Sequence, residues 1–177
     1  KGEFKVAAEN GAFYPCEKVI IAAGGKAMPS SGSDGNGYEL ARNLGHRITA
    51  IFPGLVQLKL EGNFFKQIEG VKLVGTAEVL NQNTSLAKDR GDILFGNYGV
   101  SGPPILQISR KAGELMQEGK EAVLKITLID GIPKEDLGKL LAERFRNSAG
   151  KTLEFSLVGL INKRLIPVIL KEAGFID

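Results

Sequence analysis

Two side chains on which protein chemistry often depends are almost absent from this chain of 177 residues, which has one cysteine, Cys16, and one histidine, His46. A single cysteine excludes an intramolecular disulfide and fits a reducing, cytoplasmic setting. A zinc site built from Cys and His needs about four ligands, so it is excluded as well. His46 follows a predicted helix and shows no sign of pairing with Cys16, which favours a spectator thiol over a nucleophile. The sequence therefore indicates neither a metal site nor a catalytic Cys-His pair, and the catalytic side chain stays unknown.

A large excess of one charge and a long apolar run are also missing. The net charge is +3, from 23 basic and 20 acidic residues whose signs are interspersed. Without a basic stripe that follows phosphates, we expect no nucleic-acid partner. No apolar run approaches the roughly 20 residues that cross a bilayer, and the opening KGEFKVAAEN lacks the apolar stretch of a signal peptide. We therefore expect no membrane partner either.

The first residues predict a β-hairpin. Apolar and polar residues alternate from Glu3, and the segments FKVAA and AFYP flank an Asn10-Gly11 turn. Asn-Gly between two alternating segments is a strong hairpin signal. Since the chain opens inside a hairpin, we expect it to be a piece of a longer protein.

Residues 1–47 are expected to belong to an α/β domain. The run KVIIAA, residues 18–23, is apolar and β-branched, which predicts a strand buried on both faces of a largely parallel sheet. A loop rich in Gly and Ser follows it. A helix is then predicted near Gly37 to Leu44, with Gly45 as its left-handed C-terminal cap.

Residues 48–130 change to short β-rich runs, which predict a small antiparallel sheet or barrel. The predicted strands are HRITAIF, GLVQLKL, GVKLVGTAEVL, DILFGNY and EAVLKITLI, and NQNTS and KDRGD are predicted turns. One helix interrupts them within SGPPILQISRKAGELMQEG. Ser101 is its predicted cap, and its prolines fall in the first turn, where a missing N–H costs little.

Residues 131–177 are predicted to be a helical subdomain. One helix starts at Pro133, and another runs through NKRLIPVILKEAG to end at Gly174. The expected fold class is therefore α+β, with a small antiparallel β-barrel and a helical subdomain after part of an α/β domain. The predicted domains are residues 1–47, 48–130 and 131–177.

Two glycines after the predicted strand are the first candidate binding site. Gly24 and Gly25 stand at the carboxyl end of a parallel strand, where open α/β sheets bind ligands and where glycine lets backbone N–H groups approach them. The equally weighted alternative is that they only turn the chain. A G-x-G-x-x-G fingerprint is absent, because Gly32, Gly35 and Gly37 have the wrong order.

The second candidate site is NYGVSGPPIL, residues 97–106. A helix start with small residues presents free N–H groups to an anion or a polarised oxygen, and Tyr98 adds a hydroxyl. The favoured alternative is a helix start that only packs on the barrel. Two other matches fail. GKT at residues 150–152 lacks the first P-loop glycine and follows a helix, and DGNG at residues 34–37 lacks the third acidic ligand and the closing Glu of a calcium loop.

Three segments together resemble a known family. They are VIIAAGGKAMPSSGSDGNGYELARNLGH, PGLVQLKL and DILFGNYGVSGPPILQISR. In this order they are similar to the BaiN-like, or aminoacetone-oxidase-like, flavoproteins, which are described as NAD(P)/FAD-dependent oxidoreductases. The resemblance covers essentially the whole chain. One local departure is Gly96-Asn97, where the family usually has Thr-His, and this puts a role for a histidine there in doubt.

The resemblance implies an incomplete flavoprotein. The family's members are longer, with a glycine fingerprint for FAD before this region and a returning flavin segment after it. Between them lies an inserted β-barrel with a helical subdomain. This chain resembles the end of the first FAD-binding part followed by that insert. Alone it is therefore expected to bind FAD poorly and to be inactive, with the remainder of the FAD-binding domain as its partner.

The resemblance also assigns site residues. Ala23, Gly24, Gly25 and Gly35 would contact FAD, with the loop from residue 26 to 35 close by. Tyr98 and Ser101 would lie on the substrate side of the flavin. FAD carries out the hydride chemistry itself, so no catalytic side chain is named. The family's description also suggests NAD(P)H as an electron donor and a small molecule as substrate.

Two functions remain open from the sequence. The first is the fragment of an FAD-dependent oxidoreductase just described. The alternative is a stand-alone, non-enzymatic module whose barrel and helices bind a protein partner or a small ligand. The hairpin at the start and the lone parallel strand favour the first, because an unpartnered strand leaves an aggregation-prone edge.

Overall fold

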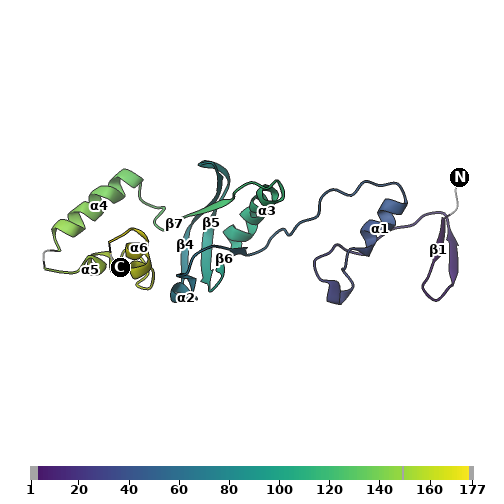
Figure 1. The fold of residues 1–177 in the computed structure, drawn as a ribbon, viewed down its shortest axis with the longest axis horizontal. Coiled ribbons are helices and arrows are strands. Elements are labelled where there is room, and N and C mark those ends of the chain that lie inside the picture. Colours follow the sequence, from purple (N-terminus) through teal and green to yellow (C-terminus); the bar gives the residue numbers. More distant parts are fainter. Residues whose placement is uncertain (1–3, 149, 176–177) are drawn as a thin grey trace. The chain divides into compact units, whose positions relative to one another are not determined.

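The computed structural model describes residues 4–148 and 150–175, and the chain divides into two compact units, residues 1–51 and 52–177 (Figure 1). The first unit contains a hairpin, a glycine-rich loop and one helix. The second contains an antiparallel sheet and the remaining helices, which confirms the α+β fold class. The three predicted domains, with boundaries after residues 47 and 130, stay a prediction.

The predicted hairpin is confirmed in the first unit. Strands β1 (Phe4–Ala7) and β2 (Phe13–Cys16) pair antiparallel. Gly11 takes the left-handed conformation, with φ 83°, and the Ala12 N–H donates to Asn10 Oδ1 over 3.0 Å. The Asn10 side chain and the positive φ of Gly11 therefore turn the chain as predicted.

The predicted helix of the first unit is confirmed as α1 (Asn36–Asn43). Gly45 has φ 88° and closes the helix, because its N–H donates to Arg42 O over 2.9 Å while the His46 N–H donates to Ala41 O over 3.1 Å. This is a left-handed C-terminal cap of the predicted kind. A short 3₁₀ helix, η1 (Pro29–Ser31), precedes α1 in the loop.

The predicted strand at residues 18–23 is wrong. These residues form neither strand nor helix, and the side chain of Ile20 is 91% exposed. A strand needs a neighbour to complete its backbone hydrogen bonds. Among the described residues of the first unit, the only strands are β1 and β2, and they pair with each other.

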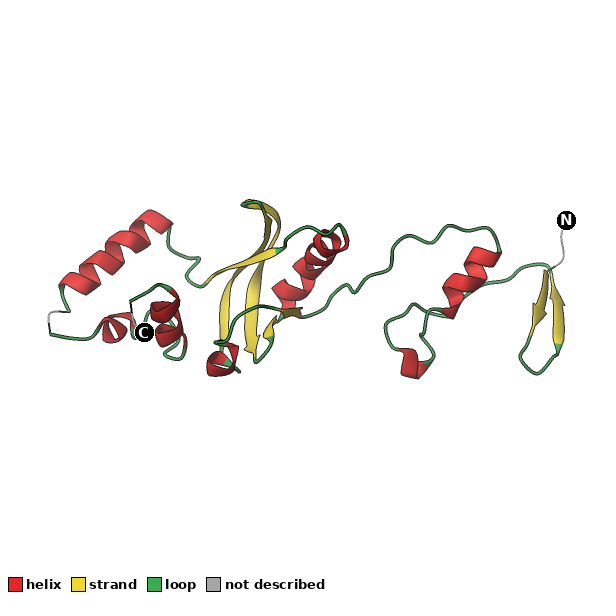
Figure 2. Cartoon of the chain, viewed as in Figure 1, coloured by secondary structure: helices red, strands yellow, loops and turns green. Residues whose placement is uncertain are grey.

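The second unit is built on a curled sheet of five antiparallel strands (Figure 2). Their order across the sheet is β3 (Leu58–Lys59), β6 (Gly99–Ser101), β5 (Thr84–Gly96), β4 (Lys72–Asn81) and β7 (Val123–Thr127). The small antiparallel barrel is thus confirmed as a half-barrel. HRITAIF was wrongly predicted as a strand, and GLVQLKL contributes only β3.

The long β4–β5 hairpin confirms one predicted turn and corrects another. Gln82 and Asn83, both with positive φ, turn the chain within NQNTS. KDRGD, residues 88–92, is not a turn but part of β5, paired with residues 74–78 of β4. Strand β4 supplies opposite charges to this segment. Lys88 Nζ lies 3.9 Å from Glu78 Oε1, and Asp92 Oδ2 lies 3.0 Å from Lys72 Nζ. Cross-strand pairing therefore outweighs the local turn signal.

Helix α3 (Pro103–Gln117) packs on the sheet through the apolar side chains expected from helical spacing. Ile105, Ile108, Ala112 and Leu115 are all buried, and the two prolines occupy the first turn. The predicted Ser101 cap is wrong, because Ser101 ends β6 and Gly102, with φ 110°, is the cap residue. A Cβ at residue 102 would lie 2.1 Å from Asp92 O, so the turn into α3 requires glycine.

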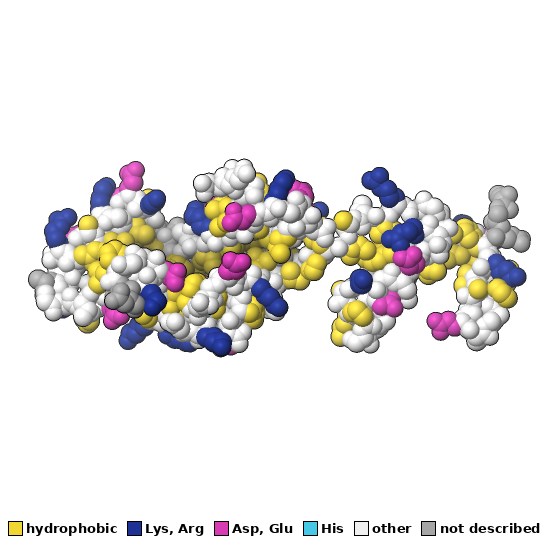
Figure 3. Space-filling model, in the orientation of Figure 1, with side chains coloured by type: hydrophobic (Ala, Val, Ile, Leu, Met, Phe, Trp, Pro, Cys, Tyr) yellow, Lys and Arg dark blue, Asp and Glu magenta, His cyan; other side chains and the backbone are white. Residues whose placement is uncertain are grey.

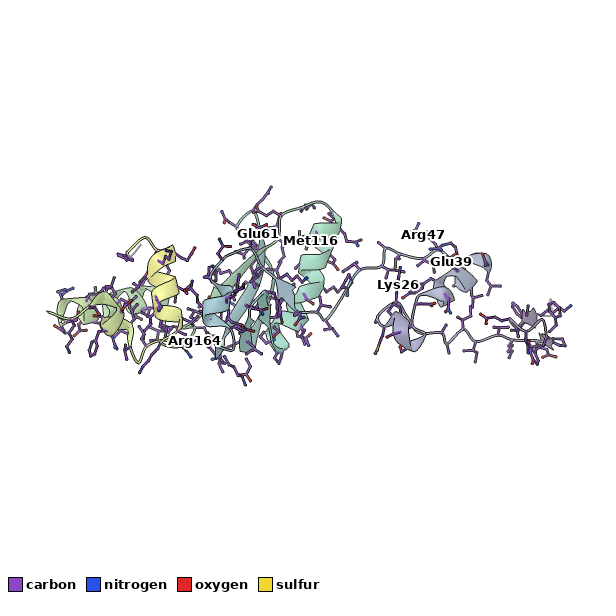
Figure 4. The ribbon with its side chains drawn as sticks, turned by 60° about the horizontal axis from the view of Figure 1, so that its bottom comes forward. Lys26, Glu39, Arg47, Glu61, Met116 and Arg164 are labelled. Atoms are coloured by element: carbon purple, nitrogen blue, oxygen red, sulfur yellow. The ribbon has the colours of Figure 1, made fainter. Side chains whose placement is uncertain are left out.

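The predicted C-terminal helices are confirmed as α4 (Lys134–Arg146), α5 (Leu153–Leu157) and α6 (Leu165–Glu172). Leu165 and Val168 of α6 join the core of the sheet and α3. The Arg164 guanidinium donates to Gln67 O and Glu69 O next to α2 (Phe65–Ile68), at 2.7 and 2.6 Å (Figure 4). In contrast, no residue of α4 is fully buried.

We expect Gly102→Ala to lower the free energy of unfolding by about 3 kcal/mol, because it adds a Cβ against a backbone carbonyl at a φ that only glycine readily takes. Chemical denaturation monitored by circular dichroism measures this. Gly138→Ala in α4 is the control, since a Cβ there meets nothing within 4 Å. It should raise stability by about 0.5–1 kcal/mol. Equal effects of the two substitutions would contradict the steric account.

Candidate functional site

The glycine-rich loop of the first unit folds back on its own side chains. Gly24 has φ 72°, and a Cβ there would lie 2.9 Å from Ser33 Oγ. A Cβ on Gly25 would lie 3.0 Å from Tyr38 Oη. Both glycines therefore let the loop pack against Ser33 and Tyr38, which is a structural use of the absent side chains.

The other predicted cofactor residues lie at the same place. Gly35, with φ 95°, is the cap residue of α1, and a Cβ there would lie 3.3 Å from the Tyr38 ring. Ala23 lies against Gly37 of α1, where a Cβ would be 3.0 Å from Ala23 Cβ. The structure thus brings Ala23, Gly24, Gly25 and Gly35 together at the start of α1. Lys26, labelled in Figure 4, belongs to the same loop, and its Cδ would lie 3.4 Å from a Cβ on Gly35.

The loop suits backbone contact with a ligand of the size and polarity of FAD. Residues 18–25 form no strand or helix, and within the described residues their backbone groups make no hydrogen bond to other backbone groups. Exposed N–H groups without bulky side chains are what a phosphate-containing cofactor needs for close approach. Residues 23–25, which carry no bulky side chain, therefore leave room for a phosphate-containing group such as that of FAD.

Tyr98 and Ser101, the predicted substrate-side residues, lie at the β5–β6 turn and the end of β6. The Tyr98 hydroxyl donates to Gln57 Oε1, and the Leu60 N–H donates to Tyr98 O over 3.0 Å. A Cβ on Gly96 would lie 2.8 Å from the Tyr98 ring, so Gly96 makes room for it. Ser101 pairs with Leu94 of β5. Tyr98 is therefore held in one orientation by the PGLVQLKL segment.

Two residues that the sequence did not single out join these motifs. Ser109, buried in α3, donates to Leu106 O over 2.8 Å and accepts from the Val56 N–H over 3.1 Å. Gln57 binds Tyr98 as described. The sequence around Ser109 or Gln57 does not predict these contacts, because each hydrogen bond joins residues more than 40 positions apart. Together they fix the PGLVQLKL segment on α3 and β6.

A groove of about 680 Å³ lies between the two edge strands, β3 and β7. Its walls are mostly apolar, including Phe64 before α2, Phe95 of β5 and Leu124 of β7, and Lys59, Glu61 and Glu121 also line it. Glu61 and Met116, labelled in Figure 4, lie at this groove. Its size is that of a small-molecule site. Neither Tyr98 nor Ser101 lines it.

Two carboxylates on the sheet have shifted pKa values for structural reasons. The pKa of Glu78 is lowered first by a hydrogen bond from Lys125 and then by one from Ser85, against the opposing effect of burial. The pKa of Asp130 is lowered by hydrogen bonds from Arg90 and Thr76. Both carboxylates are satisfied ion-pair partners, so neither is a candidate general base.

The described part of the chain has neither a metal-binding cluster nor a membrane-spanning helix. Residues 4–148 and 150–175 contain no group of three or more His, Cys, Asp or Glu side chains that could hold a metal ion. No helix in these ranges is long and apolar enough to span a membrane. Cys16 is a free, half-buried thiol in β2, and His46 is exposed after α1.

Comparison with known families gives a match over most of the chain. Residues 52–177 match the family described as "HI0933-like protein barrel and H2TH domain". This range is the second unit of the structure, with its half-barrel and helical subdomain. The match therefore agrees with the architecture found here.

Curated relatives match over nearly the whole chain. A 3-dehydro-bile acid delta(4,6)-reductase of Clostridium scindens is 35% identical over 162 residues, which is 92% of this chain and 40% of the relative. Ribosomal RNA dihydrouridine synthases are 29% identical over 89% of the chain in Escherichia coli and 26% identical over 92% in Haemophilus influenzae, covering 37% and 38% of those proteins. The chain thus spans about two fifths of the length of these relatives.

Glu78 predicts an acid-dependent loss of stability. Because its pKa in the folded state lies below the ordinary 4.5, its contribution is present above that pH and disappears as the pH falls through the folded-state value. Glu78→Gln should lower the melting temperature at about pH 7, and its difference from the unsubstituted protein should shrink toward about pH 3.

The control for Glu78 is Glu118→Gln, an exposed carboxylate whose partner is the exposed Lys120. Exposed pairs contribute little, so this substitution should leave the melting temperature nearly unchanged at each pH. Melting curves that stay parallel for Glu78→Gln and the unsubstituted protein from neutral to acid pH would contradict the role given to Glu78.

Proposed function

Because the chain belongs to the HI0933-like family, the BaiN-like flavoproteins that its motifs resemble, we propose that it is part of an FAD-dependent oxidoreductase that saturates a carbon–carbon double bond. In this proposal residues 1–51 supply part of the flavin site, and residues 52–177 form the insert that covers the substrate. The rest of the FAD-binding domain is the partner of this chain.

The observation that carries the proposal is the chemistry shared by the relatives' names. One is a delta(4,6)-reductase of a bile acid, and two make dihydrouridine, in which the uracil ring has lost a double bond. A steroid and a nucleic-acid base differ in shape, yet both reactions reduce a carbon–carbon double bond to a single bond. The proposed reaction class therefore follows what the relatives share, not either substrate.

The chain's own residues have defined parts in this proposal. Gly24, Gly25 and Gly35 hold the loop close to α1 and leave its backbone N–H groups open to FAD, with Ala23 beside them. When bound, FAD supplies the hydride, and NAD(P)H is the proposed electron donor.

On the substrate side, Tyr98 and Ser101 orient the substrate in this proposal. Gln57 fixes the Tyr98 ring, so its hydroxyl oxygen stays at one position and is available as an acceptor. The Ser101 hydroxyl is available to donate to a carbonyl beside the double bond. Such a hydrogen bond withdraws electrons from that bond and so favours hydride addition.

The alternative from the sequence, a stand-alone binding module, is the second candidate. It draws on the apolar groove between β3 and β7, which has the size of a ligand site. The comparisons support the enzyme in preference, because the family match includes the residues of this groove and a relative that matches 92% of the chain is a reductase.

The test begins with the gene product purified from its own cells, whose intact mass and flavin absorbance are measured on the same species. A flavin-containing protein longer than 177 residues is expected. It is then reduced with NADH or NADPH and mixed with a 3-oxo-4-ene steroid or a uridine-containing RNA, and the saturated product is sought by mass spectrometry. A colourless protein of this length, or no saturation of either substrate, would overturn the proposal.

Gly25 allows its two proposed roles to be separated, because its structural neighbour is known. Gly25→Ala alone crowds Tyr38 Oη, whereas Gly25→Ala with Tyr38→Phe removes that oxygen and leaves room for the new Cβ. We expect the full-length double variant still to lose most of its bound flavin, because the Cβ keeps the cofactor from the backbone. Flavin content per protein measures this.

Tyr38→Phe alone is the matched control and should retain flavin. A double variant that keeps full flavin content would show that Gly25 serves only to pack against Tyr38. Circular dichroism of each variant separates loss of flavin from loss of folding.

A further inference from the structure

We propose that the open edge of β7 pairs with one further β-strand, which comes from the part of the full-length protein outside residues 1–177. This added strand fills the groove between β3 and β7 and completes the half-barrel. The inference rests on the proposed function in one respect, that the chain is part of a longer polypeptide, and it gives the partner in that proposal a defined binding place.

The first observation is that β7 lies at an edge of the sheet. One side of β7 pairs with residues 76–80 of β4, and no described strand pairs with its other side. In an antiparallel ladder, every second residue directs its N–H and C=O groups away from the paired neighbour. Within the described residues, β7 therefore presents a row of backbone donors and acceptors to a further strand.

The second observation is that this edge lacks the usual protection against pairing. Edge strands are commonly protected by shortness, by proline or by a charged side chain such as lysine. Strand β3, at the other edge, has only two residues. Strand β7 has five residues without proline, and its one charged side chain, Lys125, is engaged with Glu78 of β4 at 3.1 Å. An edge of this kind is expected to be paired in the complete protein.

The third observation is that the groove beside β7 offers an apolar surface to such a strand. Leu124 and Ile126 of β7 pack against the core on one side and line the groove on the other, so they are only half-buried. Phe95 of β5 also lines it, as do Phe64 and Phe65, whose ring centres are 4.5 Å apart. Figure 3 shows hydrophobic side chains at the surface of the second unit. Apolar residues at alternate positions of an added strand would bury this surface.

Charges at the groove define the added strand further. Glu61 after β3 and Glu121 before β7 both line the groove and are exposed, and Glu61 is labelled beside Met116 in Figure 4. Among residues 4–148 and 150–175, neither carboxylate forms an ion pair. Lys59 also lines the groove, so its ionisable side chains sum to one negative charge. The complementary strand therefore alternates apolar residues and carries at least one Lys or Arg.

The rest of the same polypeptide is the occupant that the observations favour. The chain spans about two fifths of the length of its curated relatives, so the larger part of such a protein lies outside it. A second copy fits less well, because its β7 would bring its own sheet into a groove of about 680 Å³ between two edges of one half-barrel. A small ligand would fill the groove but leave the backbone groups of β7 without partners. One added strand satisfies both the backbone and the groove.

The test compares hydrogen–deuterium exchange of the 177-residue chain and of the full-length gene product, measured by mass spectrometry. Peptides that cover β7 should exchange roughly ten-fold or more slowly in the full-length protein, because the added strand accepts hydrogen bonds from their outward N–H groups. Peptides of β4 are the internal control, since β4 is paired on both sides in the chain itself. Their exchange should differ by less than about two-fold between the two proteins.

Two neighbouring substitutions in β7 separate strand addition from a general loss of stability. Ile126 lines the groove and Thr127 does not. A lysine at residue 126 would have its charge buried beneath the added strand, so full-length Ile126→Lys should lose the extra protection of β7. In the 177-residue chain the same lysine reaches solvent through the open groove. Thr127→Lys makes the same change in charge on the other face and should keep the protection.

Three results would overturn the inference. The first is equal exchange of β7 in the two unsubstituted proteins, a comparison that holds even where a variant does not fold. The second is protection that appears only at high protein concentration, which would assign the groove to a second copy. The third is an equal effect of Ile126→Lys and Thr127→Lys in folded proteins. A gene product of only 177 residues would also overturn it, because no segment would remain to supply the strand.

The outcome is distinguishable from that of the proposed reductase activity, because hydrogen exchange reports neither flavin nor reduction. A longer, colourless protein with a protected β7 would contradict the reductase and support the added strand. A longer, flavin-containing protein with an exposed β7 would support the flavoprotein and contradict the added strand.

Discussion

The second unit depends on how closely its backbone segments approach one another where β6 turns into α3. A Cβ on Gly102 would lie 2.1 Å from Asp92 O, and one on Gly99 would lie 2.3 Å from Leu58 O. The missing side chains let β6 lie between β5 and β3 and let α3 start directly above β5. The buried face of α3 then completes the core with β4 and β5. Because this junction also carries Tyr98 and Ser101, the proposed substrate side is built on the most sterically constrained part of the fold.

The elements that could be predicted are those whose signals are local. Asn10-Gly11 set the first hairpin, Gly45 ended α1, and the apolar spacing of α3 gave its buried face. In each case the residue types act within one turn of helix or one reversal of the chain. The order of the three motifs also sufficed to identify the family, because it is a property of the sequence alone.

The features that could not be predicted depend on partners distant in sequence. Residues 18–23 have the composition of a buried strand but no described strand beside them, and residues 88–92 have the composition of a turn but pair with β4. The hydrogen bonds of Tyr98 to Gln57 and of Ser109 to Val56 likewise join segments that only the fold brings together. The candidate flavin loop shows the same limit, since the sequence could not reveal that Gly24 and Gly25 face Ser33 and Tyr38.

The unequal burial of the three C-terminal helices has a consequence for how this region unfolds. Leu165 and Val168 tie α6 into the core of the sheet, and Arg164 adds hydrogen bonds to the carbonyls next to α2. Helix α4 has no fully buried residue; its Leu141 packs against the small cluster of Leu157, Ile166 and Leu170, and its Arg144 donates to Ser156 O. Amide hydrogens of α6 should therefore exchange with solvent only in openings that also disrupt the sheet, whereas those of α4 exchange through cheaper local openings. Because Leu157 of α5 is buried against Ile166 and Leu170 of α6, the helical subdomain should unfold as two cooperative units, with the boundary between α4 and α5.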